Sequence, residues 1–257
     1  MKNTFLIIGL LFLISACNKN EPKFIDKPSD ELVKYVVHLS GLKTTEYSKY
    51  INDEFIEVTT YFDYDSVIER ITKNTADEET SKTVYYMGPN GVADSSVSYN
   101  YITQGYDIYQ ATYEYTDGFL IEINAVSMTD GNPVEVHILR TIEDENVVSL
   151  YVKEPSGCTD HYSYNNEINK IDLGFYNGII GKASKNLKVH TFWNSGCPCS
   201  PSSAPATSVY KYETDNNGFV IREIETYTPC YHTTDPGTVT RTISTTTYEY
   251  HLNLKGD

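Results

Sequence analysis

The chain has 257 residues, with 20 basic and 35 acidic side chains and a formal net charge of −15. This length suits one large all-β domain or two small ones, and 40% apolar residues with 21% charged residues predict a folded body rather than a disordered chain. The acidic balance argues against nucleic acid as a partner, because phosphate binding needs a concentrated cationic face.

The N-terminus has the pattern of a secretory signal. Lys2 is followed by an apolar run from Phe5 to Ile14, which is too short to cross a hydrocarbon core of about 30 Å. The next residues, Ile14-Ser15-Ala16-Cys17, resemble the lipobox of bacterial lipoproteins. The resemblance implies that residues 1–16 are removed and that Cys17 is acylated. The alternative is an ordinary secreted protein cut near Ala16, which leaves Cys17 as a free thiol.

Acylation of Cys17 would tether the protein to a membrane, since two or more acyl chains give stable attachment. Residues 17–28 are polar and proline-bracketed, which is typical of a flexible linker. We therefore expect a lipid-anchored protein of the cell envelope, at the outer membrane, with its leaflet and surface exposure left open. Residues 29–257 form the single folded domain.

The start of that domain, residues 29–39, has the features of one short helix. Ser29 suits an N-cap, and Leu32, Val36 and Leu39 fall on one helical face. The β-branched residues in this stretch weaken the prediction.

Tyrosine pairs with a Tyr-x-Tyr-like spacing recur through the remaining chain, each near a turn cluster and an apolar strand start. They predict an all-β or β-dominated α+β fold, a meander of about ten to twelve antiparallel strands. We favour a strongly curved open sheet wrapped on the N-terminal helix, with a barrel as the alternative. The paired residues are Tyr61 and Tyr64, Tyr85 and Tyr86, Tyr113 and Tyr115, Tyr162 and Tyr164, Tyr210 and Tyr212, and Tyr248 and Tyr250.

The clearest module spans residues 111–123. A three-residue loop at 116–118 would place Tyr115 opposite Phe119 and Tyr113 opposite Ile121, with Glu114 and Glu122 on the other face. Further hairpins are expected at 210–221 and 134–152, a turn at 88–91, and a final strand or strand pair at 238–252.

The lipobox at 14–17 and the modules at 113–121 and 210–221 resemble the Tyr-rich β-meander lipoproteins of Bacteroidota and, more distantly, YD-type repeats. The chain departs from a true YD repeat in its spacing and in lacking regular Gly-Arg turns. The resemblance implies an envelope location and no particular activity.

Four cysteines remain after Cys17, and an even number in an exported protein predicts two disulfides. A bond between Cys197 and Cys199 would need a strained small ring, so each is expected to pair separately with Cys158 or Cys230. Which of them pairs with which stays open. The bonds would hold the Pro/Ser-rich segment 194–207 to the sheet.

A zinc site built from these cysteines with His161, His190 and His232 is the less favoured alternative, since Cys-Pro-Cys lacks the usual spacing and an exported compartment favours oxidised thiols. We expect no cofactor and no resident metal. No nucleophile elbow or phosphate-binding glycine loop is present in the sequence.

These patterns favour a non-catalytic binding or scaffolding module whose partner is a glycan, a peptide or a protein. Tyrosine and tryptophan give large, rigid contact areas, so the expected ligand surface is aromatic. One alternative is a carrier of a lipid or other apolar ligand, which predicts a continuous apolar cavity. The other is a hydrolase, with His161 or His232 as the first candidates. The expected ligand surface consists of Trp193, Tyr113, Tyr115, Tyr210 and Tyr212.

Overall fold

The computed structural model describes residues 22–101, 107–129, 132–154, 157–170, 178–193, 203–232 and 237–252. These residues contain seventeen strands and no helix. Accordingly, no helix in the described ranges is long and apolar enough to cross a membrane. Cys17 and the predicted signal lie outside the described residues.

The strands follow one another along the chain with short connections. In order they are β1 (Lys23–Ser40), β2 (Lys43–Ile51), β3 (Glu54–Tyr64), β4 (Val67–Asn74), β5 (Glu79–Met87), β6 (Ala93–Asn100), β7 (Asp107–Thr116), β8 (Phe119–Thr129), β9 (Asn132–Glu143), β10 (Asn146–Glu154), β11 (Cys158–Ile168), β12 (Asn186–Trp193), β13 (Ser203–Ala204), β14 (Thr207–Thr214), β15 (Val220–Thr228), β16 (Tyr231–His232) and β17 (Thr238–Leu252).

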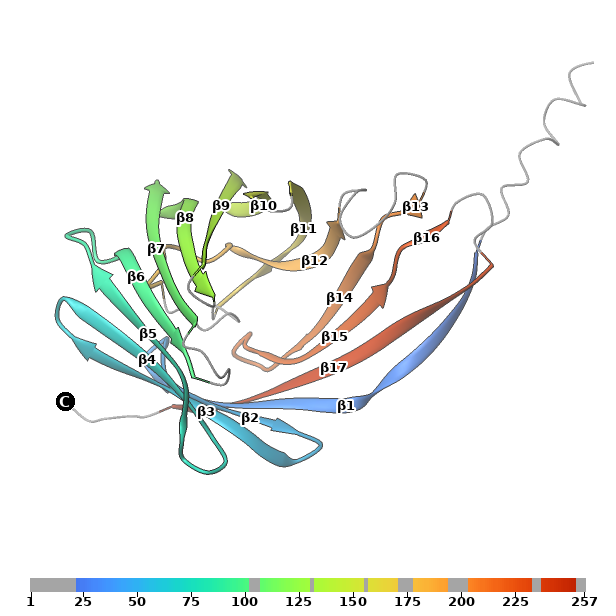
Figure 1. The fold of residues 1–257 in the computed structure, drawn as a ribbon. Coiled ribbons are helices and arrows are strands. Elements are labelled where there is room, and N and C mark those ends of the chain that lie inside the picture. The colour runs from blue at the N-terminus through green and yellow to red at the C-terminus, as the bar shows by residue number, and fades with distance from the viewer. Residues whose placement is uncertain are drawn as a thin grey trace, which may run out of the picture.

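Fifteen of these strands form one closed barrel, and β13 pairs with β16 in a separate two-stranded sheet. The barrel strands pair antiparallel with their neighbours, except where β1 and β17 close the barrel in parallel. In Figure 1 these two long strands run side by side along the lower part of the molecule. The all-β expectation is confirmed, whereas the favoured open sheet and the strand number of ten to twelve are wrong.

The expected helix at residues 29–39 is also wrong, because these residues belong to β1. This strand pairs with β17 along one edge and with β2 along the other. The valines that disfavour a helix, Val33, Val36 and Val37, suit this doubly paired strand. Pairing across the seam outweighs the local helix signals at Ser29 and in the first turn.

The predicted hairpins are confirmed, with one correction of register. Residues 107–116 and 119–129 pair around the two-residue turn Asp117-Gly118, and Tyr113 faces Ile123 instead of Ile121. A bulge beside Tyr115 absorbs the extra residue, so Leu120 is buried rather than outward. Glu114 pairs with Glu122, so these two residues share a face as expected, although the predicted register put Glu114 opposite Leu120.

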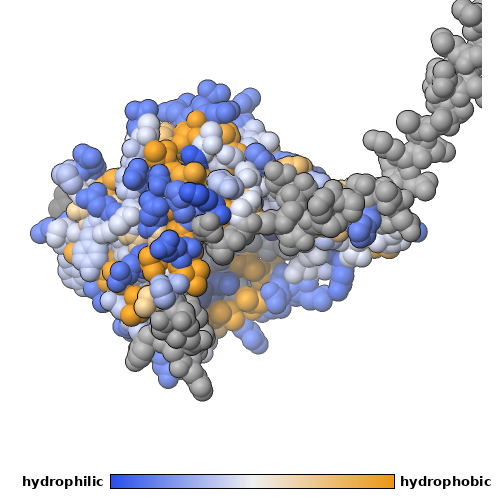
Figure 2. All heavy atoms as spheres, turned by 45° about the horizontal axis from the view of Figure 1, so that its top comes forward, coloured by the Kyte–Doolittle hydropathy of each residue, from blue (hydrophilic) through white to orange (hydrophobic). Residues whose placement is uncertain are grey.

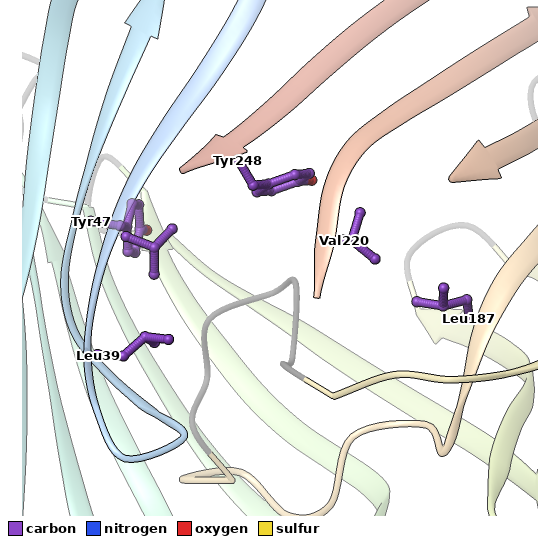
Figure 3. Packing of buried hydrophobic residues seen from close by; sticks show 6 residues of the cluster. Leu39, Tyr47, Leu187, Val220 and Tyr248 are labelled. Atoms are coloured by element: carbon purple, nitrogen blue, oxygen red, sulfur yellow. The ribbon is translucent and has the colours of Figure 1, made fainter. Parts of the chain in front are cut away.

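Buried side chains identify which face of each strand points inward. One cluster joins residues from β1, β2, β12, β15 and β17, as Figure 3 shows. We call the space enclosed by the fifteen strands the lumen, and alternation along each strand then assigns the inward residues. The cluster consists of Val37, Leu39, Tyr47, Leu187, Val220 and Tyr248.

Residues 178–185, which we call the cap segment, lie at one end of the barrel. This segment lies across three strand connections: Ile179 O accepts from Ala93 N at 2.7 Å, Lys182 N donates to Gly118 O at 2.8 Å, and Lys185 N donates to Glu145 O at 3.0 Å. Ile179 is buried among Tyr85 and Ala93 in a second apolar cluster. The cap segment therefore packs into the barrel end with both backbone and side chains.

Candidate functional site

Tyrosines from both halves of the barrel form most of the lumen wall. Strand register places them on the same face as the buried cluster, and burial raises the pKa of nine of them. The repeated tyrosine pairs of the sequence thus mark inward positions. We call this set the tyrosine wall: Tyr35, Tyr47, Tyr61, Tyr85, Tyr109, Tyr113, Tyr115, Tyr162, Tyr164, Tyr210, Tyr212, Tyr248 and Tyr250.

Many of these hydroxyls are bonded within the protein. Tyr115 donates to Ala93 O at 2.6 Å, Tyr212 to Lys188 O at 2.7 Å, and Tyr250 to Val220 O at 2.8 Å. The Tyr113 hydroxyl lies 2.6 Å from Ser96 Oγ. A buried tyrosine needs such a partner, so much of the tyrosine wall stabilises the barrel itself.

Three tyrosine rings from β1, β2 and β17 contact one another in the lumen. Tyr35 lies 5.8 Å from Tyr248 in a parallel stack and 6.0 Å from Tyr47 in an edge contact. Tyr248 lines one cavity and Tyr47 lines another. The lumen therefore offers two compartments, each bordered by a ring of this cluster.

The first compartment is a cavity of about 520 Å³ bounded by the cap segment and by β9, β10, β11, β12, β14, β15 and β17, with Arg140 entering from β9. At its wall the Lys188 ammonium lies 4.5 Å from the centre of the Tyr210 ring and 5.4 Å from that of Tyr162. Glu223 and Glu225 enter from β15. We call Lys188, Tyr162, Tyr210, Glu223 and Glu225 the lysine site.

Burial shifts the pKa values of Lys188 and Glu223 in opposite directions, and in both groups it disfavours the charged form. It lowers the pKa of Lys188, while Glu223 and Glu225 oppose that shift. It raises the pKa of Glu223, with Lys188 acting against the rise. Ser208 donates a hydrogen bond of 2.6 Å to Glu225. These groups are held in a setting where a charge is costly, which is a feature of binding and catalytic sites.

The second compartment, about 470 Å³, is lined largely by hydroxyls from β3 to β6. Thr59 and Thr72 lie 2.9 Å apart through their hydroxyl oxygens, and Thr83 and Ser98 lie 3.0 Å apart. Arg70 donates to the Tyr47 hydroxyl at 2.6 Å. Both compartments thus have hydroxyl or charged groups on their walls, which differs from the continuous apolar cavity expected of a lipid carrier.

The structure brings together only part of the expected ligand surface. Tyr210 and Tyr212 line the first compartment, and Trp193 meets the Tyr227 ring at 5.9 Å. Tyr113 and Tyr115 also face inward, from β7. The sequence analysis does not predict Lys188, Glu223 or Glu225 as site residues. The available signal concerns the two glutamates, whose spacing of two residues places both on one face of a strand.

The described cysteine and histidine candidates include Cys158 and His161 in β11, and Cys230 and His232 at β16. Cys158 begins β11 and Cys230 precedes β16, whereas Cys197 and Cys199 lie outside the described residues. His161 contacts the Phe192 ring and His232 pairs with Ser203. Within the described ranges, no three His, Cys, Asp or Glu side chains come close enough to hold a metal ion.

The outer wall carries ion pairs and a histidine–carboxylate contact within the strands. Lys82 lies 2.8 Å from Glu69, and His137 lies 2.9 Å from Glu122. In each strand these residues are next to inward-facing ones, which places them on the outer face. Figure 2 shows hydrophilic residues spread over the visible face, with hydrophobic residues in patches among them. Three further pairs are Lys34–Glu249, Arg222–Glu213 and Arg241–Asp26.

No protein-family model and no curated protein matches the chain. Among solved structures, it is similar to a porin-like protein from Bacteroides uniformis ATCC 8492, with 17% identity and a TM-score of 0.50 over 73% of this chain and 78% of that one. A porin-like protein from Bacteroides vulgatus ATCC 8482 gives 16% identity and a TM-score of 0.49 over 77% and 93%. At this identity, the first likeness shows a shared β-barrel fold.

Proposed function

We propose that the chain is a lipid-anchored protein of the bacterial cell envelope that binds a polar ligand inside its barrel and catalyses no reaction. The observation that carries the proposal is the polarity of the lumen, where Lys188, Glu223 and Glu225 share a cavity of about 520 Å³ with tyrosine rings. A cavity of this size with a few convergent polar groups suits a small ligand.

The outer wall supports a barrel that lies in water beside the membrane. A Lys or Arg on the lipid face of a barrel costs about 2–4 kcal/mol at the midplane of the bilayer. The outer pairs Lys82–Glu69, Lys34–Glu249 and Arg222–Glu213 lie within the strands, where such a cost would apply. We therefore propose that acyl chains on Cys17 are the membrane contact.

The same lumen disfavours the lipid-carrier alternative. An apolar ligand in the first compartment would remove water from Lys188 and from Glu223 without offering hydrogen bonds in return. A polar ligand keeps those groups solvated by its own donors and acceptors.

Disulfides from Cys158 and Cys230 to Cys197 and Cys199 remain part of the proposal. The crosslinks would fix the connections that follow β12 and β15 to the barrel, as the oxidising envelope permits.

The anchoring is tested by expressing the full chain with Cys17→Ser in a bacterial host. We expect the chain that retains Cys17 in the membrane fraction and the Cys17→Ser variant in the soluble fraction. Circular dichroism should show that the variant is a folded β protein. A membrane-spanning barrel would remain in the membrane fraction without its lipid, and this result would overturn the proposed water-exposed barrel. The outward substitution Lys211→Met serves as a control that leaves the anchor intact.

A further inference from the structure

We infer that the ligand of the lysine site is a neutral saccharide. This inference rests on the proposed binding function, and it names the ligand class from the chemistry of the site. Each class of small ligand places a different demand on Lys188, Glu223 and Glu225.

The ammonium of Lys188 is available to a ligand. It stands over the Tyr210 and Tyr162 rings, and no carboxylate of a described residue lies within 4.0 Å of its Nζ. An ammonium has three donors and no acceptor, so the group can donate to ligand oxygens. The ring faces hold the charge in place without consuming its donors.

The carboxylates provide the opposite capability. Glu223 and Glu225 alternate inward along β15, and Ser208 bonds only one oxygen of Glu225. An ionised carboxylate accepts hydrogen bonds at about four lone-pair positions. The site therefore presents strong donors and strong acceptors within one cavity.

Charged and apolar ligands fit this arrangement poorly. The wall of this cavity carries charges of both signs, since Arg140 and Lys182 line it together with Lys188. An anion drawn to these cations would still meet the carboxylates of Glu223 and Glu225. A cation drawn to the carboxylates would meet Lys188. An apolar ligand would leave all of these groups without solvation.

A sugar satisfies both sets of groups, because each hydroxyl donates to a carboxylate and accepts from an ammonium. The apolar face of a sugar ring can lie on an aromatic ring, and Tyr210, Tyr212 and Tyr248 border the same cavity. The first compartment, with a volume of about 520 Å³, thus suits a small neutral saccharide rather than a single charged group.

The test is titration calorimetry on the folded full chain with four kinds of probe. These are a set of neutral disaccharides (maltose, cellobiose and mannobiose), galacturonic acid, glucosamine and palmitate. We expect a neutral disaccharide to bind, and its affinity to fall at least tenfold in Lys188→Met and in Glu223→Gln. Lys211→Met, which changes an exposed lysine on the outer face of β14, should leave the affinity unchanged.

A second measurement needs no variant and so does not depend on their folding. Amine acylation of the unmodified protein, followed by mass spectrometry, should show Lys188 protected by the bound disaccharide and Lys211 unprotected. Binding that is equally strong in all variants, or that leaves Lys188 unprotected, would overturn the assigned site. Binding of palmitate, galacturonic acid or glucosamine in place of the disaccharides would overturn the saccharide class and leave lumenal binding standing. If no probe of any class binds, the saccharide inference and the proposed function both fail.

Discussion

Lys188 and Glu223 are ionisable residues of the lumen whose charged forms are disfavoured by burial. Burial raises the pKa of Glu223 above its ordinary value of 4.5. A carboxyl whose pKa is raised on folding stabilises the protein below its unfolded pKa, and this contribution is lost as the pH rises through the folded value. Above its folded pKa, Glu223 is ionised inside the lumen, and this buried charge lowers the free energy of unfolding.

Glu223→Gln should consequently raise the free energy of unfolding at neutral pH, because the amide needs no ionisation in the lumen. The gain should shrink as the pH falls through the raised pKa, and vanish below about 4.5, where the unfolded carboxyl is also protonated. Urea unfolding measured over this pH range checks it. Glu213→Gln, on the outer face opposite Arg222, is the matched control. A stability difference that does not depend on pH would contradict the prediction.

The sequence predicted the tyrosines of the site better than its charges. Tyr210 and Tyr212 follow from the repeated module, since alternation places both on one face. The inward position of Lys188 cannot be predicted from alternation. Thr191 faces inward, so regular alternation along β12 would place Lys188 on the outer face. A bulge between β11 and β12 shifts the register there, so Lys188 pairs with Tyr164 and enters the lumen. A bulge of this kind depends on the neighbouring strand and leaves no local signal in the sequence.

At the scale of elements, the Gly-Phe step of the repeated module has a structural role. Lys182 Nζ donates to Asp117 O at 2.8 Å and lies 5.2 Å from the Phe119 ring. In the second copy, Lys170 Nζ donates to Asn217 O and lies 5.9 Å from the Phe219 ring. Each hairpin turn therefore accepts a hydrogen bond from a lysine, Lys182 of the cap segment in one copy and Lys170, the last described residue after β11, in the other.

Gly181 is the tightest point of the cap segment. Its φ is +92°, and a Cβ there would lie 2.9 Å from Gly118 O and 3.0 Å from a Tyr115 ring carbon. Gly181→Ala should lower the free energy of unfolding by about 1–3 kcal/mol through backbone strain, with the collision adding to it. Gly91→Ala is the control, since Gly91 has a φ of +74° but open space around it. Equal losses in the two variants, measured by urea unfolding, would show that the close approach is unimportant.

The first strand shows how tertiary pairing overrides a local pattern. Residues 29–39 carry an N-cap and a helical apolar spacing, yet they pair with β2 and, more than 200 residues away, with β17. Hairpins such as 134–152 were predictable because their partners are adjacent in the chain and their turns have recognisable residues. The pairing of β1 with β17, which closes the barrel, has no such local signal in the sequence.

Leu39 tests the packing of this strand, because it is fully buried where β1 meets both neighbours. Leu39→Ala should lower the free energy of unfolding by about 2–5 kcal/mol, since a cavity would remain in the cluster of Figure 3. Leu42→Ala, in the turn that follows, changes a leucine that is 64% exposed and should have little effect. A small loss at Leu39 in denaturant unfolding would place β1 outside the stable core.

For the whole molecule, closure by the parallel β1–β17 pair encloses most of its tyrosines at once. The sequence predicted β strands and inward tyrosines but not closure, because one pairing between distant strands decides between an open sheet and a barrel. Closure removes sheet edges that would otherwise be available to other chains. Because closure buries these tyrosines, we expect their ionisation to be coupled to unfolding of the whole barrel.

Alkaline titration should reveal this coupling. Burial raises the pKa of tyrosines around the lumen, Tyr162, Tyr212 and Tyr248 among them. Their contribution to stability is complete below the unfolded tyrosine pKa of about 10 and is lost as the pH rises toward the folded values. Tyrosinate absorbance in the native protein should therefore rise steeply above about pH 10, together with loss of the β-sheet circular dichroism. In urea the same absorbance should rise gradually around pH 10, as for an unfolded chain. A gradual rise in the native protein, with the circular dichroism unchanged, would mean that the tyrosines can ionise inside an intact barrel, and therefore that water reaches the whole of the lumen.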